Sequence, residues 1–414
     1  MSYLYAKIFT SKTEKIMTEN ASSIKLDRTV SNDIAYIGCE DFEIQLFEGQ
    51  YYLPEGMCYN SYVILDEKIA VMDTVDARCG EQWLSKLNAA LNGRKPDYIV
   101  VQHVEPDHSS LVATFTEKYP DAKIICSAAA AKMLALYFPK ADLSAKIQTV
   151  KEGDTLALGK HTLQFATAPM VHWPEVIVTY DSKDKVLFSA DGFGKFGVYD
   201  SEADDWSCEA RRYYFNICGK YGVQVQALLK KASNFDIKTI CPLHGPILKG
   251  EMLAEALRLY TIWSAYDVES EGVFVAYCTM HGNTGNAAEA LAEILRKKGA
   301  KKVATSNLCE EDWAEGIEDA FKYGKIVLAA PTYDGGLFPK MVDFIHHLKI
   351  KNYQKRRVAL LENGSWAPQA ARIMREMLAD FKDVEVCPTV ATIRGALKDS
   401  DIAALETLAD ELLK

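Results

Sequence analysis

The sequence YIVVQHVEPDH, residues 98–108, is the most informative stretch of this chain of 414 residues. Its apolar start is typical of a buried strand, and four possible metal ligands follow at once. The proline favours extended geometry at Glu105, so we expect His103, Glu105 and Asp107, which are spaced by two residues, to project from one side of the chain. We expect His108 to turn into the next helix.

Three further short apolar strands each lead to a possible ligand. FATAPM leads to His172, KVLFSA leads to Asp191, and IKTICP leads to His244. A single histidine after a strand is more often structural, but four imidazoles and three carboxylates in such positions are more than one ion needs. Because the set contains no sulfur, it predicts two ions of iron, manganese or zinc that share a bridging carboxylate.

The pattern H-x-E-x-D-H, followed by a distant His, Asp and His, resembles the metallo-β-lactamase fold, an αββα sandwich with its metals at one edge of two sheets. Zinc hydrolases of that fold generally have histidine at the position of Glu105. The glutamate is similar to that of the diiron branch, the flavodiiron proteins. The similarity extends to the segments 47–76, 172–175, 209–214 and 243–246.

The resemblance implies a role for each candidate ligand. It assigns one iron to His103, Glu105 and His172, the other iron to Asp107, His108 and His244, and the bridge between them to Asp191. It also implies that Tyr213 reaches into the gas pocket, with core packing in an amphipathic helix as the alternative. His161, His346 and His347 are expected to be structural or surface residues.

The second half of the chain contains a phosphate-type loop. GVFVAYC, residues 272–278, is typical of a buried parallel strand, and a polar loop and a helix follow it. The hydroxyls of Thr279 and Thr284, the loop amides and the helix N-terminus can bind a phosphate dianion, and Gly282 permits the tight curvature. The loop has no lysine or arginine, so it matches neither the P-loop nor the G-x-G-x-x-G motif of dinucleotide folds.

Two later strands, 325–331 and 357–363, open into loops that contain glycines and an aromatic residue. With strands at 272–278, about 302–307 and 384–390, the unit resembles a flavodoxin with five parallel strands. The third loop reads NGSWAP where flavodiiron proteins often have GSYGW. The resemblance implies FMN contacts from Thr279, Met280, His281, Gly282, Asn283, Thr284, Pro331, Thr332, Tyr333, Asp334, Gly335, Gly336, Asn363, Gly364, Ser365, Trp366 and Ala367.

The chain changes character near residue 268, where a polar segment separates a helical run from a strand. We expect an α/β multi-domain protein: an αββα metallo-β-lactamase-like sandwich, then a flavodoxin-like doubly wound five-stranded parallel sheet. The predicted parts are an N-terminal extension (1–22), a diiron domain (23–265), a linker (266–271) and an FMN-binding domain (272–414). Met17 is an alternative natural start, and the sequence leaves this open.

Composition excludes several other classes of protein. The net charge of -10 provides no basic surface for nucleic acid or anionic lipid. Ten cysteines without a C-x-x-C pair argue against a disulfide framework and a thiolate metal site. No apolar run is long enough to cross a membrane, and a cytoplasmic protein is expected.

Together the two resemblances imply an oxidoreductase. Electrons would pass through FMN to a diiron site that reduces O2 to water, NO to N2O, or both, in defence against oxygen or nitrosative stress. The family also implies an external donor, rubredoxin with its reductase, and a head-to-tail homodimer or a dimer of such dimers. The alternatives are a zinc hydrolase fused to an electron-transfer module and an electron carrier with a vestigial metal domain.

Overall fold

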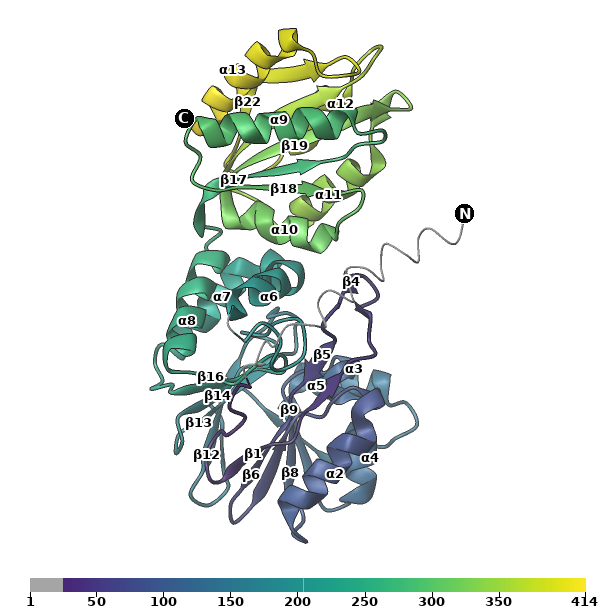
Figure 1. The fold of residues 1–414 in the computed structure, drawn as a ribbon. Helices are drawn as coiled ribbons and strands as arrows, with labels where there is room; N and C mark the ends of the chain where they lie inside the picture. Colours follow the sequence, from purple (N-terminus) through teal and green to yellow (C-terminus); the bar gives the residue numbers. More distant parts are fainter. Residues whose placement is uncertain (1–24, 204) are drawn as a thin grey trace.

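The computed structural model describes residues 25–203 and 205–414, so the predicted extension at residues 1–22 lies outside the described part of the chain. Two α/β domains follow one another along the chain (Figure 1). The first ends with helix α8 (Gly250–Ser264), and strand β17 (Ser270–Tyr277) begins the second. The last residues of the predicted linker, Ser270 and Glu271, are therefore already part of a strand.

The N-terminal domain contains two six-stranded sheets. In spatial order, the first consists of β1 (Ile34–Tyr36), β6 (Tyr62–Leu65), β7 (Ile69–Met72), β8 (Tyr98–Val101), β9 (Lys123–Ser127) and β10 (Ile147–Val150). The second consists of β11 (Thr155–Ala157), β12 (Thr162–Thr167), β13 (Ile177–Asp181), β14 (Val186–Phe188), β15 (Thr239–Cys241) and β16 (Leu248–Lys249). Two short pairs lie beside them: β2 (Cys39–Asp41) with β5 (Met57–Tyr59), and β3 (Leu46–Phe47) with β4 (Tyr51–Tyr52).

Alternation of side chains along the strands explains the layers of this domain. In β8, Val100 belongs to the apolar core between the two sheets, whereas Ile99 and Val101 belong to the core under the outer helices. Strands buried on both faces read as continuous apolar runs, as β8 does. The covering helices are α2 (Gly80–Leu91), α4 (Val112–Lys118) and α5 (Ala128–Tyr137), with α6 (Trp206–Tyr213), α7 (Gly222–Ala232) and α8 on the other side. The predicted αββα sandwich is confirmed.

The C-terminal domain is a doubly wound parallel sheet, as predicted. Its strand order is β18 (Val303–Asn307), β17, β19 (Tyr323–Tyr333), β21 (Arg356–Asn363) and β22 (Val384–Ile393), and the short β20 (Gly336–Leu337) pairs antiparallel with β19. One face packs against α9 (Asn283–Lys297) and α13 (Ile402–Leu413), and the other against α10 (Trp313–Lys322), α11 (Pro339–Ile350) and α12 (Ala370–Leu378). The carboxyl ends of the strands therefore meet at one edge, where such folds bind ligands.

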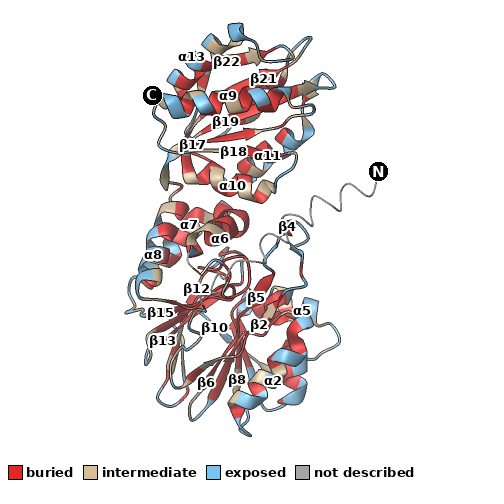
Figure 2. Cartoon of the chain, viewed as in Figure 1, coloured by how far each residue is buried: buried red, intermediate tan, exposed pale blue. Residues whose placement is uncertain are grey.

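Two consecutive arginines of α6 connect the domains. Arg211 donates to both carboxylate oxygens of Glu269, at 2.6 and 2.5 Å, and lies 3.1 Å from Glu318 in α10. Arg212 lies 2.6 Å from Asp312, at the N-terminus of α10. Both guanidinium groups are buried. The helices that meet there, α6 and α10, contain buried and intermediate residues but no exposed ones (Figure 2). Bidentate, desolvated pairs of this kind hold two surfaces in a defined geometry.

Within the described residues, no helix is both long and apolar enough to cross a membrane.

Candidate metal centre and flavin site

The seven predicted ligands converge at one edge of the two sheets. As expected, His103 follows β8, His172 lies between β12 and β13, Asp191 follows β14, and His244 follows β15. The prediction of extended backbone through Asp107 is wrong, because residues 106–109 form a short helix, α3 (Pro106–Ser109). Proline is favoured at the first helical position, where its missing N–H costs nothing, so it starts a helix here instead of prolonging the strand.

This helix separates the ligands into two groups. The first group contains His103, Glu105, His172 and Asp191, and the second contains Asp107, His108 and His244. In the first group, the Nε2 atoms of His103 and His172 each lie 3.1 Å from Glu105 Oε2. In the second, the Nε2 atoms of His108 and His244 lie 3.0 Å apart and both approach Asp107 Oδ2, at 3.2 and 3.3 Å. Each group therefore surrounds one point with nitrogen and oxygen atoms.

Asp191 lies between the two groups. Its Oδ2 is 3.0 Å from His172 Nε2 and 3.4 Å from His103 Nε2. Its Oδ1 is 3.2 Å from His108 Nε2 and 3.9 Å from His244 Nε2. One oxygen thus faces each group, which is the placement that a bridging carboxylate requires.

Two of the histidines are oriented by partners on their Nδ1 atoms. Glu175 Oε1 lies 2.8 Å from His103 Nδ1 and also accepts from the Val104 amide, and the Cys58 carbonyl lies 2.8 Å from His244 Nδ1. Such contacts fix the tautomer that leaves Nε2 free for a metal. His108 Nδ1 is buried and has no hydrogen-bond partner among the described residues. The orientation of His108 is therefore less constrained than those of His103 and His244.

The electrostatics of the centre favour cations. Burial alone would lower the pKa of His172, but Asp191 and Glu105 raise it to about 9. Burial would raise the pKa of Asp191, but His103 and His108 hold it well below its ordinary range. Asp191 thus stays anionic, and the imidazole of His172 attracts a positive charge that a proton or a metal ion can supply.

Unsatisfied buried atoms test whether metal ions fit the centre. Both carboxylate oxygens of Asp107 and Oδ1 of Asp191 are buried without a hydrogen-bond partner among the described residues. Carboxylate oxygens left in this way are costly unless a cation binds them. The donors are imidazole nitrogens and carboxylate oxygens, without sulfur, and such sets suit non-haem iron. The residues present therefore fit a pair of iron ions.

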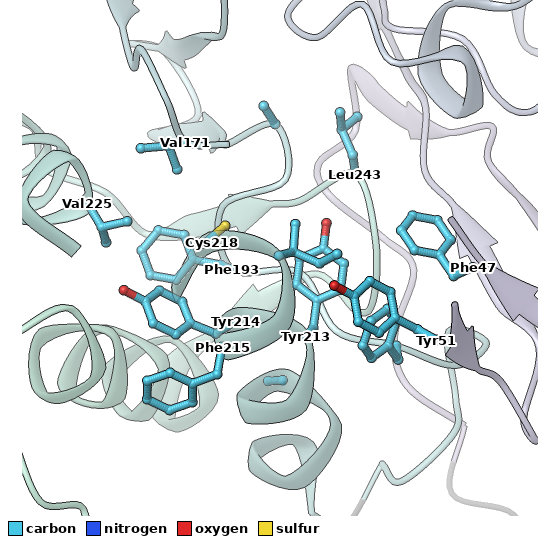
Figure 3. Close-up of a cluster of buried hydrophobic side chains, with 14 of the residues drawn as sticks. Phe47, Tyr51, Val171, Phe193, Tyr213, Tyr214, Phe215, Cys218, Val225 and Leu243 are labelled. Carbon is cyan, nitrogen blue, oxygen red and sulfur yellow. The ribbon is translucent and has the colours of Figure 1, made fainter. Parts of the chain in front are cut away.

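A wall of aromatic side chains, formed by Phe47, Tyr51, Phe196 and Tyr213, lies beside His244 of the second group of ligands. The ring of Phe47 lies 5.5 Å from that of His244, and Phe196 contacts both Phe47 and Tyr51. Tyr213 is fully buried, and its ring lies 5.6 Å from that of His244. Figure 3 shows Tyr213 among the aromatic side chains of this wall. Its hydroxyl has no hydrogen-bond partner among the described residues, so the residue is both packed in the core and next to the metal centre.

The loops of the C-terminal domain form a second site. A cavity of about 160 Å³ lies at the carboxyl edge of the parallel sheet. Of the predicted FMN contacts, those that line it are Thr279, Met280, His281, Asn283, Thr284, Pro331, Thr332, Asn363, Gly364, Ser365 and Trp366. Those that do not are Gly282, Tyr333, Asp334, Gly335, Gly336 and Ala367.

The sequence prediction missed one loop of this site, and two of the predicted contact residues also make hydrogen bonds within the protein. Gly395, after β22, also lines the cavity, and Asn363 exchanges two hydrogen bonds with its backbone. The Thr332 hydroxyl accepts from the Gln369 amide at the start of α12. Asn363 and Thr332 therefore shape the loops through protein contacts. Only the position of Arg394-Gly395 after the fifth strand could have signalled the missing loop.

The first loop provides the features that a phosphate needs. Thr279 Oγ1 is buried and has no hydrogen-bond partner among the described residues. Gly282 adopts a φ of 86° at the N-cap of α9, and nothing lies within 4 Å of the position that a Cβ would take. An open, left-handed turn at the N-terminus of a helix of 15 residues is suited to an anion. The residues present therefore fit the phosphate of FMN.

Two family models match the chain, one in each domain. A model described as "ODP family beta lactamase" matches residues 57–245, and a model described as "Flavodoxin domain" matches residues 274–408.

Several known proteins are similar to this chain over 85% or more of its length. A coenzyme F420H2 oxidase from Methanothermobacter marburgensis is 30% identical over 370 residues, which is 85% of this chain and 90% of that protein. An anaerobic nitric oxide reductase flavorubredoxin from Vibrio vulnificus is 28% identical over 85% of this chain and 72% of its own length. The structure of rubredoxin oxygen:oxidoreductase from Desulfovibrio gigas has a TM-score of 0.86 and 25% identity, covering 93% of this chain and 97% of that one.

Proposed function

The chain belongs to the flavodiiron protein family, an oxidoreductase family with FMN and a diiron centre as cofactors, and on that premise we propose that it reduces O2 to water, NO to N2O, or both. The observation that carries this proposal is the combination, in one chain, of seven convergent nitrogen and oxygen ligands with a flavodoxin-type phosphate loop. A zinc hydrolase has no use for a flavin, so the alternative would not explain the flavin site of the C-terminal domain.

When bound, FMN and the iron pair supply one-electron uptake and multi-electron delivery to the gas, and the residues of this chain hold them in place. His103, Glu105 and His172 would bind one iron, and Asp107, His108 and His244 the other. Asp191 would hold both, since its two oxygens face different groups. Glu175 would keep His103 Nε2 directed at the metal.

The surroundings of the centre would control access of gas and water. Phe47, Phe196 and Tyr213 make the wall next to His244 apolar, which admits a small neutral gas and excludes bulk water. The Tyr213 hydroxyl is buried and has no hydrogen-bond partner in the described part of the chain, so it would be free to donate to a bound gas or to water. Burial raises the pKa of Tyr213 well above its ordinary value, so it keeps its proton.

A head-to-tail homodimer, or a dimer of such dimers, would bring the two cofactors together. The cavity beside Thr279 is smaller than the roughly 300 Å³ of ordinary ligand sites, so the flavin ring would lie largely outside it. Large apolar side chains are exposed around it, namely Met280, Tyr333 and Trp366. Others, Phe42, Leu46 and Tyr52, are exposed near the wall of the metal centre. Contact between these two surfaces would bury both.

The function is tested by anaerobic reduction of the purified protein, followed by exposure to each gas. We expect reoxidation of FMN and turnover with O2, NO or both, with two iron ions and one FMN per chain. Rubredoxin with its reductase is the external donor to try first. Purified active protein that contains zinc in place of iron would exclude the proposal.

The dimer is tested separately by Phe42→Asp, which places a charge in the proposed contact at a side chain that is 71% exposed in the single chain. We expect a monomer in which FMN is still reduced by the donor but gas reduction is lost. Full gas reduction in a proven monomer would contradict the dimer and leave the reaction itself unaffected.

A further inference from the structure

A third group of histidine and carboxylate side chains lies in the N-terminal domain, away from the metal centre. It consists of His161, which precedes β12, Asp181, which ends β13, and Asp184 in the following turn. Strands β12 and β13 are antiparallel, with Leu163 opposite Asp181, and the connection between them carries His172. The group is therefore at the end of this hairpin farthest from His172 and the metal centre.

The three side chains each offer one ligand atom in a compact group. A ring nitrogen of His161, a carboxylate oxygen of Asp181 and a carboxylate oxygen of Asp184 all lie within 4.8 Å of one another. His161 and Asp181 are fully buried, with Nδ1 and Oδ1 3.0 Å apart. The distance equals the 3.0 Å between His172 Nε2 and Asp191 Oδ2 in the metal centre. Neighbouring ligands of an ion that binds at about 2.1 Å are separated by about 3 Å.

These atoms also lack hydrogen-bond partners. His161 Nδ1, Asp181 Oδ1 and Asp184 Oδ2 are all buried without one in the part of the chain that the structure describes. The Nδ1 and Oδ1 atoms are close, but they do not meet in a hydrogen-bond geometry. The other oxygen of Asp181 accepts from the Asp184 amide at 2.9 Å, so only Oδ1 is left for a ligand. Asp107 and Asp191 show the same pattern in the metal centre.

The charge around the group favours a cation. Asp66 Oδ2 accepts from the His161 amide at 2.6 Å, and Asp33 Oδ2 lies 3.6 Å from His161 Nε2. With Asp181 and Asp184, four carboxylates lie around His161. Among the described residues, the ammonium group in contact is that of Lys183, 2.5 Å from Asp33, 3.3 Å from Asp184 and 3.2 Å from His161 Nε2. One ammonium leaves most of this negative charge uncompensated.

We propose that His161, Asp181 and Asp184 form a third metal site, which binds one divalent transition-metal ion. One imidazole nitrogen and two carboxylate oxygens, completed by water, suit Zn²⁺ or Mn²⁺. With the ion on Nδ1, the hydrogen on Nε2 would be directed at the carboxylate of Asp33. Lys183 could then no longer donate to Nε2 and would keep only its ion pairs with Asp33 and Asp184. The ion ties the turn before β12 to the turn after β13, so its role is structural and separate from gas reduction.

Zinc uptake by the protein loaded with iron and FMN tests the site. The protein is equilibrated with Zn²⁺, freed of loosely bound ions, and analysed for zinc and iron in the same sample. We expect one zinc per chain with the iron content unchanged, and loss of that zinc in His161→Gln and Asp184→Asn. Asp236→Asn removes an exposed carboxylate of the same domain that pairs with Lys185 and Lys238, and it should retain the zinc.

Two results would overturn the proposal: no zinc beyond the amount that displaces iron, or equal zinc in the parent, His161→Gln and Asp184→Asn. His161 is fully buried, so His161→Gln risks misfolding. Asp184 lies in a turn and is partly exposed, which makes Asp184→Asn the safer variant. Iron, FMN and gas turnover, measured in parallel, report on the proposed function, so failure of one proposal is distinguishable from failure of the other.

Discussion

The metal centre and the flavin site are built in opposite ways. The metal centre consists of buried charged side chains that converge from four strand ends and are held by contacts such as Glu175 with His103. The flavin site consists of loop backbone around a small cavity, and its large side chains, such as Trp366, are exposed. The charged site is therefore complete within one domain, whereas the loop site leaves large apolar side chains exposed in the absence of its ligand.

The largest effect should come from Asp191→Asn. Asp191 lies between the two groups, and its oxygens lie within 3.9 Å of four Nε2 atoms. Mutation of a group that contacts only the ligands lowers metal affinity by up to about 100-fold. Loss of the charge of Asp191, itself a proposed ligand, should therefore weaken iron binding by about 100-fold or more. FMN content should not change, since the flavin site shares no residue with the centre. Iron and flavin analysis of the purified variant measures both, and undiminished iron would remove the bridge.

Glu175→Gln should have the next largest effect. The glutamine can still accept from His103 Nδ1, but the negative charge that favours the metal-binding tautomer is lost. Iron affinity, measured by competition with a chelator, should fall by about tenfold. Thr167→Val, in the same domain but outside the centre, is a suitable control. An affinity equal to that of the parent would mean that geometry alone orients His103.

The same contrast explains how much could be predicted from the sequence. The four strand ends and their ligands follow from apolar runs and the polar residues after them, because each signal is local. The contact between the Cys58 carbonyl and His244 joins residues 186 positions apart, so no local pattern reports it. The start of α3 at Pro106 was missed because proline is compatible with both an extended segment and a first helical turn. Gly395 was missed because its loop is ordered through Asn363.

Thr279→Val tests whether the buried hydroxyl of the first loop contributes to FMN binding. The change keeps the shape of the side chain and removes a buried hydroxyl that has no hydrogen-bond partner among the residues described. A hydrogen bond to a charged group is worth about 1.5–3 kcal/mol, so FMN should bind at least about tenfold more weakly. Titration of the flavin-free protein with FMN measures this, and Thr284→Ala should weaken binding in the same direction. Iron content is the internal control, and equal FMN affinity in both variants would remove the phosphate loop.

Trp366→Ala should have the smallest effect, and it separates the contribution of the ring from that of the phosphate. The side chain is 81% exposed, so its removal should change the stability of the flavin-free protein by less than about 0.5 kcal/mol. If the indole packs on the flavin, FMN affinity should fall by about 0.5–1.5 kcal/mol, or two- to tenfold. Trp366→Phe should restore most of it, because a ring face returns. A loss larger than that of Thr279→Val would contradict the view that the phosphate loop dominates, and would instead make the exposed aromatic surface the main determinant of flavin binding.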